Sequence, residues 1–78
     1  MDLDSIGSRC KTARHHRRLT QQQVADRLGM ARQNYTRIEC DQMGLMVAHL
    51  LKLAEIFDVP AAALLPKRAV PNPEEEGT

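Results

Sequence analysis

The chain has 78 residues and a formal net charge of +1, enough for one small domain with a modest core. Hydrophobic residues make up 42% of it, there is no tryptophan, and no apolar run approaches the roughly 20 residues that cross a bilayer. We therefore expect no membrane association. Because no signal peptide is recognisable, we expect a cytoplasmic protein.

The charge is unevenly distributed along the chain. Residues 1–39 hold eight Lys or Arg against four acidic residues, whereas residues 40–78 hold three against six. The first half is therefore net +4 and the second half net −3. A basic half joined to an acidic half is typical of a protein that presents one face to a polyanion.

A first helix is predicted over residues 5–16. At helical spacing, its inner stripe consists of Ile6, Cys10, Ala13 and Arg17. Cys10 is then a small buried hydrophobe, while Cys40, which follows the third helix, is expected to be exposed. In a reducing compartment the two thiols need not pair, and neither CxxC nor HxxxH spacing occurs, so we predict no metal site.

The second helix follows an N-cap signal at Thr20, whose hydroxyl can accept a backbone N–H of the first turn. Val24, Ala25 and Leu28 form one buried stripe, in which the small Ala25 permits a close crossing by the next helix. Gly29 then supplies a tight turn between the two helices. Two short helices joined in this way have the layout of a helix-turn-helix.

The third helix is predicted over residues 31–39 and has two distinct faces. At 100° per residue, an arc of about 140° carries the polar side chains Arg32, Gln33, Thr36 and Arg37. The opposite, inward side carries Ala31, Tyr35 and Ile38. Arg pairs with guanine, Gln pairs with adenine, and the Thr methyl contacts the thymine methyl. The outward face therefore suits base edges in a major groove, although a merely solvated polar face has the same pattern.

A fourth helix is predicted over residues 46–57, and Pro60 is well placed to begin a short fifth helix over residues 61–65. No strand-like alternation appears, so the predicted fold class is all-α with five helices. We assign residues 1–66 to a helix-turn-helix DNA-binding domain and residues 67–78 to a Pro/Glu-rich tail. That tail has almost no apolar content and is expected to be disordered.

These features together resemble the Cro and lambda-repressor-like family, also called the XRE type. The resemblance covers residues 6–65 and is carried by Leu19-Thr20-Gln21, Leu28-Gly29, Arg37-Ile38-Glu39, Leu50-Leu51-Lys52-Leu53-Ala54, Val59 and Leu64-Leu65. It implies a compact five-helix bundle that binds double-stranded DNA without a cofactor. It also implies that Gln21 meets a DNA phosphate and that Arg14 pairs with Glu39.

The sequence departs from the family pattern in three ways. Ala31 stands where the family usually has a Ser or Thr cap, which should weaken the start of the third helix by about 1 kcal/mol. Tyr35 replaces an aliphatic residue, so its hydroxyl must find a partner or reach solvent. Cys40 and Asp41 replace the usual Asn/Arg-Gly, so the glycine that commonly terminates this helix is missing.

The leading hypothesis is a sequence-specific transcriptional regulator that binds a palindromic operator as a homodimer. The residues expected to read bases are Arg32, Gln33, Thr36 and Arg37. The residues expected to hold phosphates are Arg17, Arg18, Gln21, Gln22 and Asn34. The two-fold interface is expected on the fourth and fifth helices, at Leu51, Ile56, Leu64 and Leu65.

Chain length suggests the small controller proteins of restriction–modification systems, and short phage repressors and antitoxins share the pattern. The main alternative is therefore an antitoxin-type regulator, whose principal partner is another protein and which autoregulates its own promoter. An enzyme is not expected, because no Ser/His/Asp, paired-carboxylate or phosphate-loop constellation is present.

Overall fold

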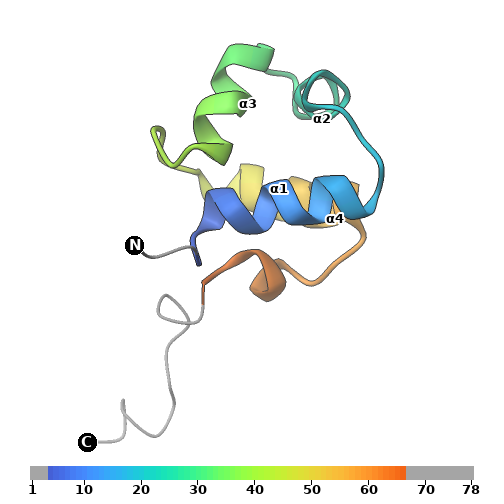
Figure 1. Cartoon of the computed structure of the whole chain (residues 1–78), viewed down its shortest axis with the longest axis vertical. Helices are drawn as coiled ribbons and strands as arrows, with labels where there is room; N and C mark the ends of the chain where they lie inside the picture. The colour runs from blue at the N-terminus through green and yellow to red at the C-terminus, as the bar shows by residue number, and fades with distance from the viewer. Residues whose placement is uncertain (1–3, 67–78) are drawn as a thin grey trace, which may run out of the picture.

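The computed structural model describes residues 4–66, which form only helices and the loops between them (Figure 1). The α-helices are α1 (Ile6–His16), α2 (Gln21–Leu28), α3 (Arg32–Glu39) and α4 (Val47–Phe57). A 3-10 helix, η1 (Ala61–Leu64), follows them. Residues 1–3 and the predicted tail 67–78 lie outside the described residues.

The all-α fold class is confirmed for the described residues, but the fifth α-helix is not. The segment after α4 is the 3-10 helix η1, which has Pro60 at its N-cap. Pro66 follows soon afterwards, so only residues 61–65 lie between the two prolines. Five residues are fewer than two turns of an α-helix, and a 3-10 turn fits such a short piece.

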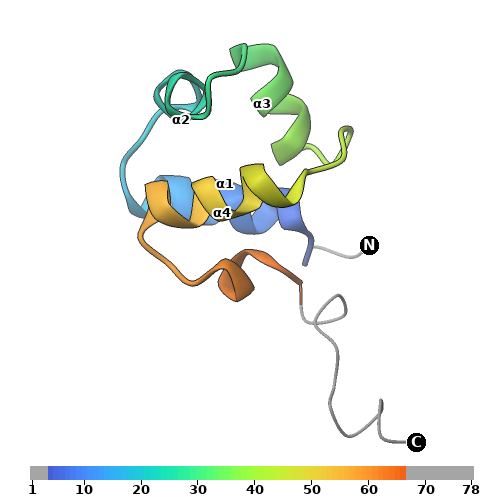
Figure 2. The same cartoon turned by 180° about the vertical axis from the view of Figure 1, so that it is seen from behind.

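The elements are arranged so that the helix-turn-helix lies on one side of the domain. Helices α1 and α4 pack side by side, with α2 and α3 on one side of them and η1 on the other (Figures 1 and 2). No helix among residues 4–66 is long and apolar enough to cross a membrane. The position of α3 leaves one of its faces uncovered by the other elements.

The core draws side chains from all five elements. Its buried hydrophobic residues are Cys10, Val24, Ala25, Leu28, Tyr35, Ile38, Leu53, Ala54, Phe57 and Leu64. Cys10 is fully buried, as predicted, and this burial raises the pKa of its thiol to about 12. Cys40 is exposed, also as predicted.

Two positions are buried differently from the predictions. Leu64 is 1% exposed, so the expectation that it contributes to an exposed interface patch is wrong. Leu64 instead closes the core between η1 and the long helices. Arg17 was placed on the inner stripe of α1, but it is exposed because the helix ends at His16 and Arg17 is its C-cap. Arg14 is the buried cation of this helix.

Two helices begin with complete capping boxes. Before α2, the Gln23 N–H donates to Thr20 Oγ1 at 3.1 Å, and the Thr20 N–H donates to Gln23 Oε1 at 2.8 Å. The same exchange joins Ser5 and Ser8 at the start of α1. No side chain caps α3 at Ala31. The first two helices are thus well defined by local sequence.

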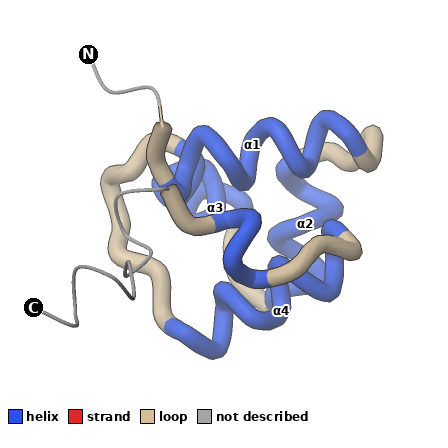
Figure 3. Tube along the Cα trace, turned by 90° about the horizontal axis from the view of Figure 1, so that it is seen from below, coloured by secondary structure: helices blue, strands red, loops and turns tan. Residues whose placement is uncertain are grey.

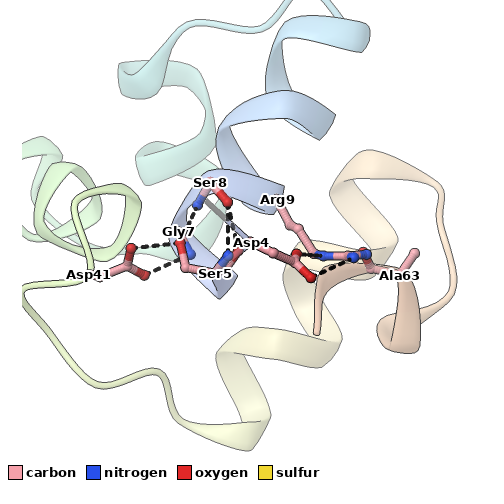
Figure 4. Close-up of polar contacts among 7 residues, drawn as sticks. All are labelled: Asp4, Ser5, Gly7, Ser8, Arg9, Asp41 and Ala63. Carbon is pink, nitrogen blue, oxygen red and sulfur yellow. Dashed lines mark hydrogen bonds and ion pairs between the residues drawn. The ribbon is translucent and has the colours of Figure 1, made fainter. Parts of the chain in front are cut away.

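The loop after α3, tan in Figure 3, is fastened to the start of α1 by Asp41 (Figure 4). Ser5 Oγ donates to Asp41 Oδ2 at 2.6 Å, and the Gly7 N–H donates to Asp41 Oδ1 at 2.9 Å. A Cβ on Gly7 would lie only 2.5 Å from the Glu39 carbonyl oxygen, so the two helices approach very closely here. Asp41 has φ of 58°, the left-handed conformation that a terminal glycine would otherwise supply.

Candidate nucleic-acid interface

The turn between α2 and α3 has the geometry of a helix-turn-helix. Gly29 has φ of 74° and ψ of 31°, a left-handed conformation that glycine adopts at little steric cost. The Met30 N–H donates to the Ala25 carbonyl at 3.0 Å and closes the turn. Val24, Ala25 and Leu28 are buried against the neighbouring helices, as predicted. The buried stripe of α2 and the turn at Gly29 together fix the orientation of α3 relative to α2.

Helix α3 presents a polar face outward. Arg32, Gln33 and Arg37 are exposed, and Thr36 is half-buried. On the inner side, Tyr35, Ile38 and Glu39 are buried. Ala31 was also expected inside, but it is exposed because it precedes the helix in an extended conformation, so the helical projection does not apply to it. The outward arc predicted from periodicity is therefore present on the surface.

A hydrogen-bond chain ties the start of α2 to the outward face of α3. Thr36 Oγ1 donates to Gln21 Oε1 at 3.0 Å, and Gln21 Nε2 donates to Glu39 Oε1 at 3.1 Å. Sequence reasoning assigned Gln21 to a phosphate and Thr36 to a base, and missed this link. Because the partners are 15 and 18 positions apart, no local pattern indicates that they meet.

Beneath α3, Arg14 and Glu39 form a buried ion pair, as the family resemblance implied. Arg14 Nε donates to Glu39 Oε2 at 2.6 Å, and Nη2 donates to Oε1 at 3.2 Å. Arg14 Nη1 also donates to the Leu19 carbonyl at 3.0 Å. Burial by itself raises the pKa of Glu39, but the hydrogen bonds that it accepts from Arg14 and Gln21 outweigh burial and hold that pKa below its usual value.

The Tyr35 ring is fully buried beside this ion pair. Its hydroxyl makes no hydrogen bond of acceptable geometry within the described residues, although the Glu39 carboxylate is its polar neighbour. Burial, followed by the polar interaction with the Glu39 carboxylate and by its charge, raises the pKa of the phenol, so Tyr35 stays neutral. Tyr35 replaces an aliphatic residue of the family pattern, and its hydroxyl therefore needed a hydrogen-bond partner. The structure does not supply a well-formed hydrogen bond to it.

The two arginines predicted to contact phosphates, Arg17 and Arg18, differ in their hydrogen bonds. Arg17 Nε donates to the Phe57 carbonyl at 2.8 Å, and its Nη2 donates to Asp58 Oδ2 at 3.2 Å, so its guanidinium secures the end of α4. Arg18 is exposed and makes no side-chain hydrogen bond within residues 4–66. Of the two arginines, Arg18 is therefore the one whose charge is unpaired.

The two remaining phosphate candidates lie on α2 and α3. Gln22 is exposed and its Nε2 donates to Asp26 Oδ1 at 2.8 Å, one turn further along α2. Asn34 is half-buried on α3. Gln21 and Gln22 lie in the first turn of α2, which is next to α3 (Figure 1), and Gln21 bonds to Thr36 of α3, whereas Arg17 bonds to Phe57 at the end of α4.

The comparisons with known proteins agree with this geometry. A family model described as a helix-turn-helix domain matches residues 7–70. The chain belongs to this helix-turn-helix family. No curated protein matches the chain significantly.

Solved structures of other helix-turn-helix proteins share the fold. The restriction-modification controller protein C.AhdI from Aeromonas hydrophila is 28% identical, with a TM-score of 0.74 over 82% of this chain and 97% of that one. The SinR protein/SinI protein complex gives 24% identity and a TM-score of 0.73 over 92% and 72% of the two chains. A hypothetical transcription factor, NHTF, from Neisseria gives 20% and 0.71 over 81% and 72%. The chain is thus a helix-turn-helix DNA-binding protein.

The charges around this helix-turn-helix favour a polyanion. Four arginines are exposed on or next to it without an ion pair among residues 4–66, namely Arg18, Arg27, Arg32 and Arg37. Asp26 is the exposed acid in the same segment, because Glu39 is buried and neutralised by Arg14. Such an excess attracts phosphates regardless of nucleotide sequence. No cluster of three potential metal ligands occurs among the described residues.

Proposed function

We propose that this protein is a sequence-specific transcriptional regulator that binds a palindromic operator as a homodimer, with α3 in the major groove. The observation that carries the proposal is the exposed face of α3, on which Arg32, Gln33 and Arg37 project from a helix held by the Gly29 turn. Arg and Gln make paired hydrogen bonds to guanine and adenine edges. The 28% sequence identity to C.AhdI, over 97% of that chain, favours a restriction–modification controller.

The polar residues divide by their expected role. Arg32, Gln33 and Arg37 read bases, with Thr36 contributing its methyl group, since its hydroxyl already donates to Gln21. The expected phosphate contacts come from Arg18, Gln21, Gln22 and Asn34. Gln21 has a second amide hydrogen beyond the one given to Glu39, so it can meet a phosphate without breaking the chain of hydrogen bonds. Arg17 was also expected at a phosphate, but its guanidinium is bonded to Phe57 and Asp58 at the end of α4.

The test of base reading compares Arg37→Ala with Lys11→Ala, an exposed cation on α1. Sites are first selected from random DNA, and affinities are then measured on the selected operator and on single-base variants. Arg37→Ala should cost roughly 1–3 kcal/mol on the operator and relax the preference at one base pair. Lys11→Ala should change neither. An equal loss on operator and random DNA would show that α3 does not read bases through Arg37.

The test of phosphate binding uses the salt dependence of affinity. Arg18→Ala should weaken binding to all sequences alike and reduce the slope of log K against log salt by about one unit, because one fewer counterion is released. Gln21→Ala should also weaken all sequences, but leave the slope unchanged because Gln21 is uncharged. A slope unchanged by Arg18→Ala would remove that residue from the interface.

The alternative is an antitoxin-type regulator whose main partner is another protein. The observation that favours it is a group of exposed apolar side chains, Met43, Met46, Val47 and Leu51. Purification of the tagged chain from its own cells distinguishes the two functions. A stoichiometric protein partner supports the alternative, and its absence supports the DNA-directed regulator.

A further inference from the structure

A pocket lies between α1, the end of α4 and η1, on the side of the two long helices away from α2 and α3 (Figures 1 and 2). Its volume of about 570 Å³ is within the range of about 300–1,000 Å³ that is typical of small-molecule sites. No residue of α2 or α3 lines it. The pocket is therefore separate from the surface that is expected to meet DNA.

The floor of the pocket is apolar. Phe57 and Leu64 belong to the core, and Ala13 and Val59 are half-buried beside them. Ala63 adds an exposed methyl group on η1. A floor of aliphatic and aromatic side chains with a small number of polar groups around it favours a ligand with an apolar body.

Two arginines of α1 mark the ends of the pocket. At one end, Arg9 Nη1 donates to the Ala63 carbonyl at 3.1 Å, and Arg9 Nη2 donates to Asp4 Oδ2 at 3.2 Å (Figure 4). At the other end, Arg17 Nε donates to the Phe57 carbonyl at 2.8 Å. The two arginines are eight positions apart on the chain, which corresponds to about 12 Å along the helix axis. This length suits a compact organic molecule, such as one aromatic ring with a short side chain.

The two arginines differ in how much charge they offer to the pocket. Arg9 is paired with Asp4, which also lines the pocket. Arg17 is paired with Asp58, but that carboxylate is not part of the lining and its side chain is 86% exposed, so the pair is weak. Arg17 Nη1 makes no hydrogen bond within residues 4–66. With His16 neutral, two arginines against one aspartate give the lining a net charge of +1.

We propose that this pocket binds a small carboxylic acid with an apolar body, whose carboxylate accepts hydrogen bonds from Arg17. The guanidinium group matches the planar geometry of a carboxylate. Thr12 and His16, four positions apart on α1, are exposed in the same wall and add polar groups next to Arg17. The apolar body covers the methyl groups of Ala13 and Ala63. The positive lining selects this anion over a neutral molecule of the same shape.

A comparison of cinnamate with its neutral amide, cinnamamide, tests the proposal. Both are titrated into the full chain, and backbone amide shifts are followed in two-dimensional ¹H–¹⁵N NMR spectra. Cinnamate should give saturable shifts confined to α1, the end of α4 and η1, with a dissociation constant on the order of 0.1–1 mM. Cinnamamide should bind in the same place about fivefold to tenfold more weakly, because it lacks the charge that Arg17 recognises.

Two pairs of variants complete the experiment. Arg17→Gln should weaken cinnamate about fivefold to tenfold and leave cinnamamide unchanged, whereas Lys11→Gln removes an exposed charge outside the pocket and should change neither. Ala63→Leu should weaken both ligands, because the larger side chain occupies the pocket. Ala62→Leu makes the same change at an exposed position of η1 that does not line the pocket, and should affect neither ligand. Thermal melts establish that each variant folds.

Four results would overturn the proposal. They are an absence of saturable shifts up to about 10 mM cinnamate, shifts that lie on α2 and α3 instead, cinnamamide binding as tight as that of cinnamate, and an equal loss of both ligands in Arg17→Gln. The last result would mean that Arg17 only holds the end of α4 in place. None of these measurements involves DNA, so the proposed function is tested separately by the α3 variants.

Discussion

The substitution Glu39→Ala tests how much the buried ion pair beneath α3 contributes to stability. The side chains of Arg14 and Glu39 are 10% and 2% exposed and share two hydrogen bonds. Without the carboxylate, the Arg14 guanidinium stays buried with the Leu19 carbonyl and the His15 ring as its remaining partners. Loss of one partner from a buried pair costs about 3 kcal/mol. A domain of this size has a total stability of roughly 4–12 kcal/mol, so the loss is a large fraction.

Thermal unfolding followed by circular dichroism measures this effect. For a small domain, a loss of about 3 kcal/mol lowers Tm by roughly 12–24 °C. Asp26→Ala is the matched control, because that exposed carboxylate accepts only a surface hydrogen bond from Gln22, and its removal should change stability by no more than about 0.5 kcal/mol. The double change of Arg14 and Glu39 to Met should be less destabilising than Glu39→Ala, because no charge is left buried and unpaired.

Two results would refute this reasoning. A Tm unchanged by Glu39→Ala would show that the pair does not contribute to stability. Single-variant losses for Arg14→Met and Glu39→Met that simply add in the double variant would show that the two side chains are not coupled. In either case the geometry of α3 would depend on other contacts, such as the Thr36 bond to Gln21 and the Asp41 bonds to Ser5 and Gly7.

Three further predictions concern pH, thiol reactivity and close packing. The pKa of Glu39 is lower in the folded than in the unfolded state. The contribution of Glu39 to folding stability is therefore complete above its unfolded-state pKa of about 4.3, and it is lost as the pH falls through the folded-state pKa. The Tm difference between the protein and Glu39→Gln should therefore narrow below about pH 4, and a constant difference would contradict this. Ellman's reagent should modify Cys40 alone in the native protein and Cys10 only in denaturant, because Cys10 is buried with a pKa of about 12. Gly7→Ala should destabilise by about 1–3 kcal/mol, because its Cβ would meet the Glu39 carbonyl oxygen at 2.5 Å, whereas Gly44→Ala has open space and should be close to neutral in a denaturant titration.

Much of the helix-turn-helix was predictable because its signals are local. Thr20 begins α2 through bonds to a residue three positions away, and Gly29 ends it through its own backbone conformation. The two faces of α3 also follow from periodicity alone, apart from Ala31, which was expected on the inward side but precedes the helix and is exposed. The Arg14–Glu39 pair was predictable from the family resemblance, although nothing in the spacing of those two residues indicates it.

Tertiary structure alone decided which of the distant polar and apolar groups meet. Gln21 bonds to Thr36 and Glu39, and Arg17 holds the end of α4, because packing brings segments 15 to 41 positions apart into contact. Both Leu51 and Leu64 were likewise expected in an apolar interface patch. Whether such a residue is buried depends on what covers it: η1 and the long helices enclose Leu64, while no part of the described chain covers Leu51. Local sequence thus determined where α2 begins and where the turn before α3 lies, and the packing of the helices determined which side chains remain exposed.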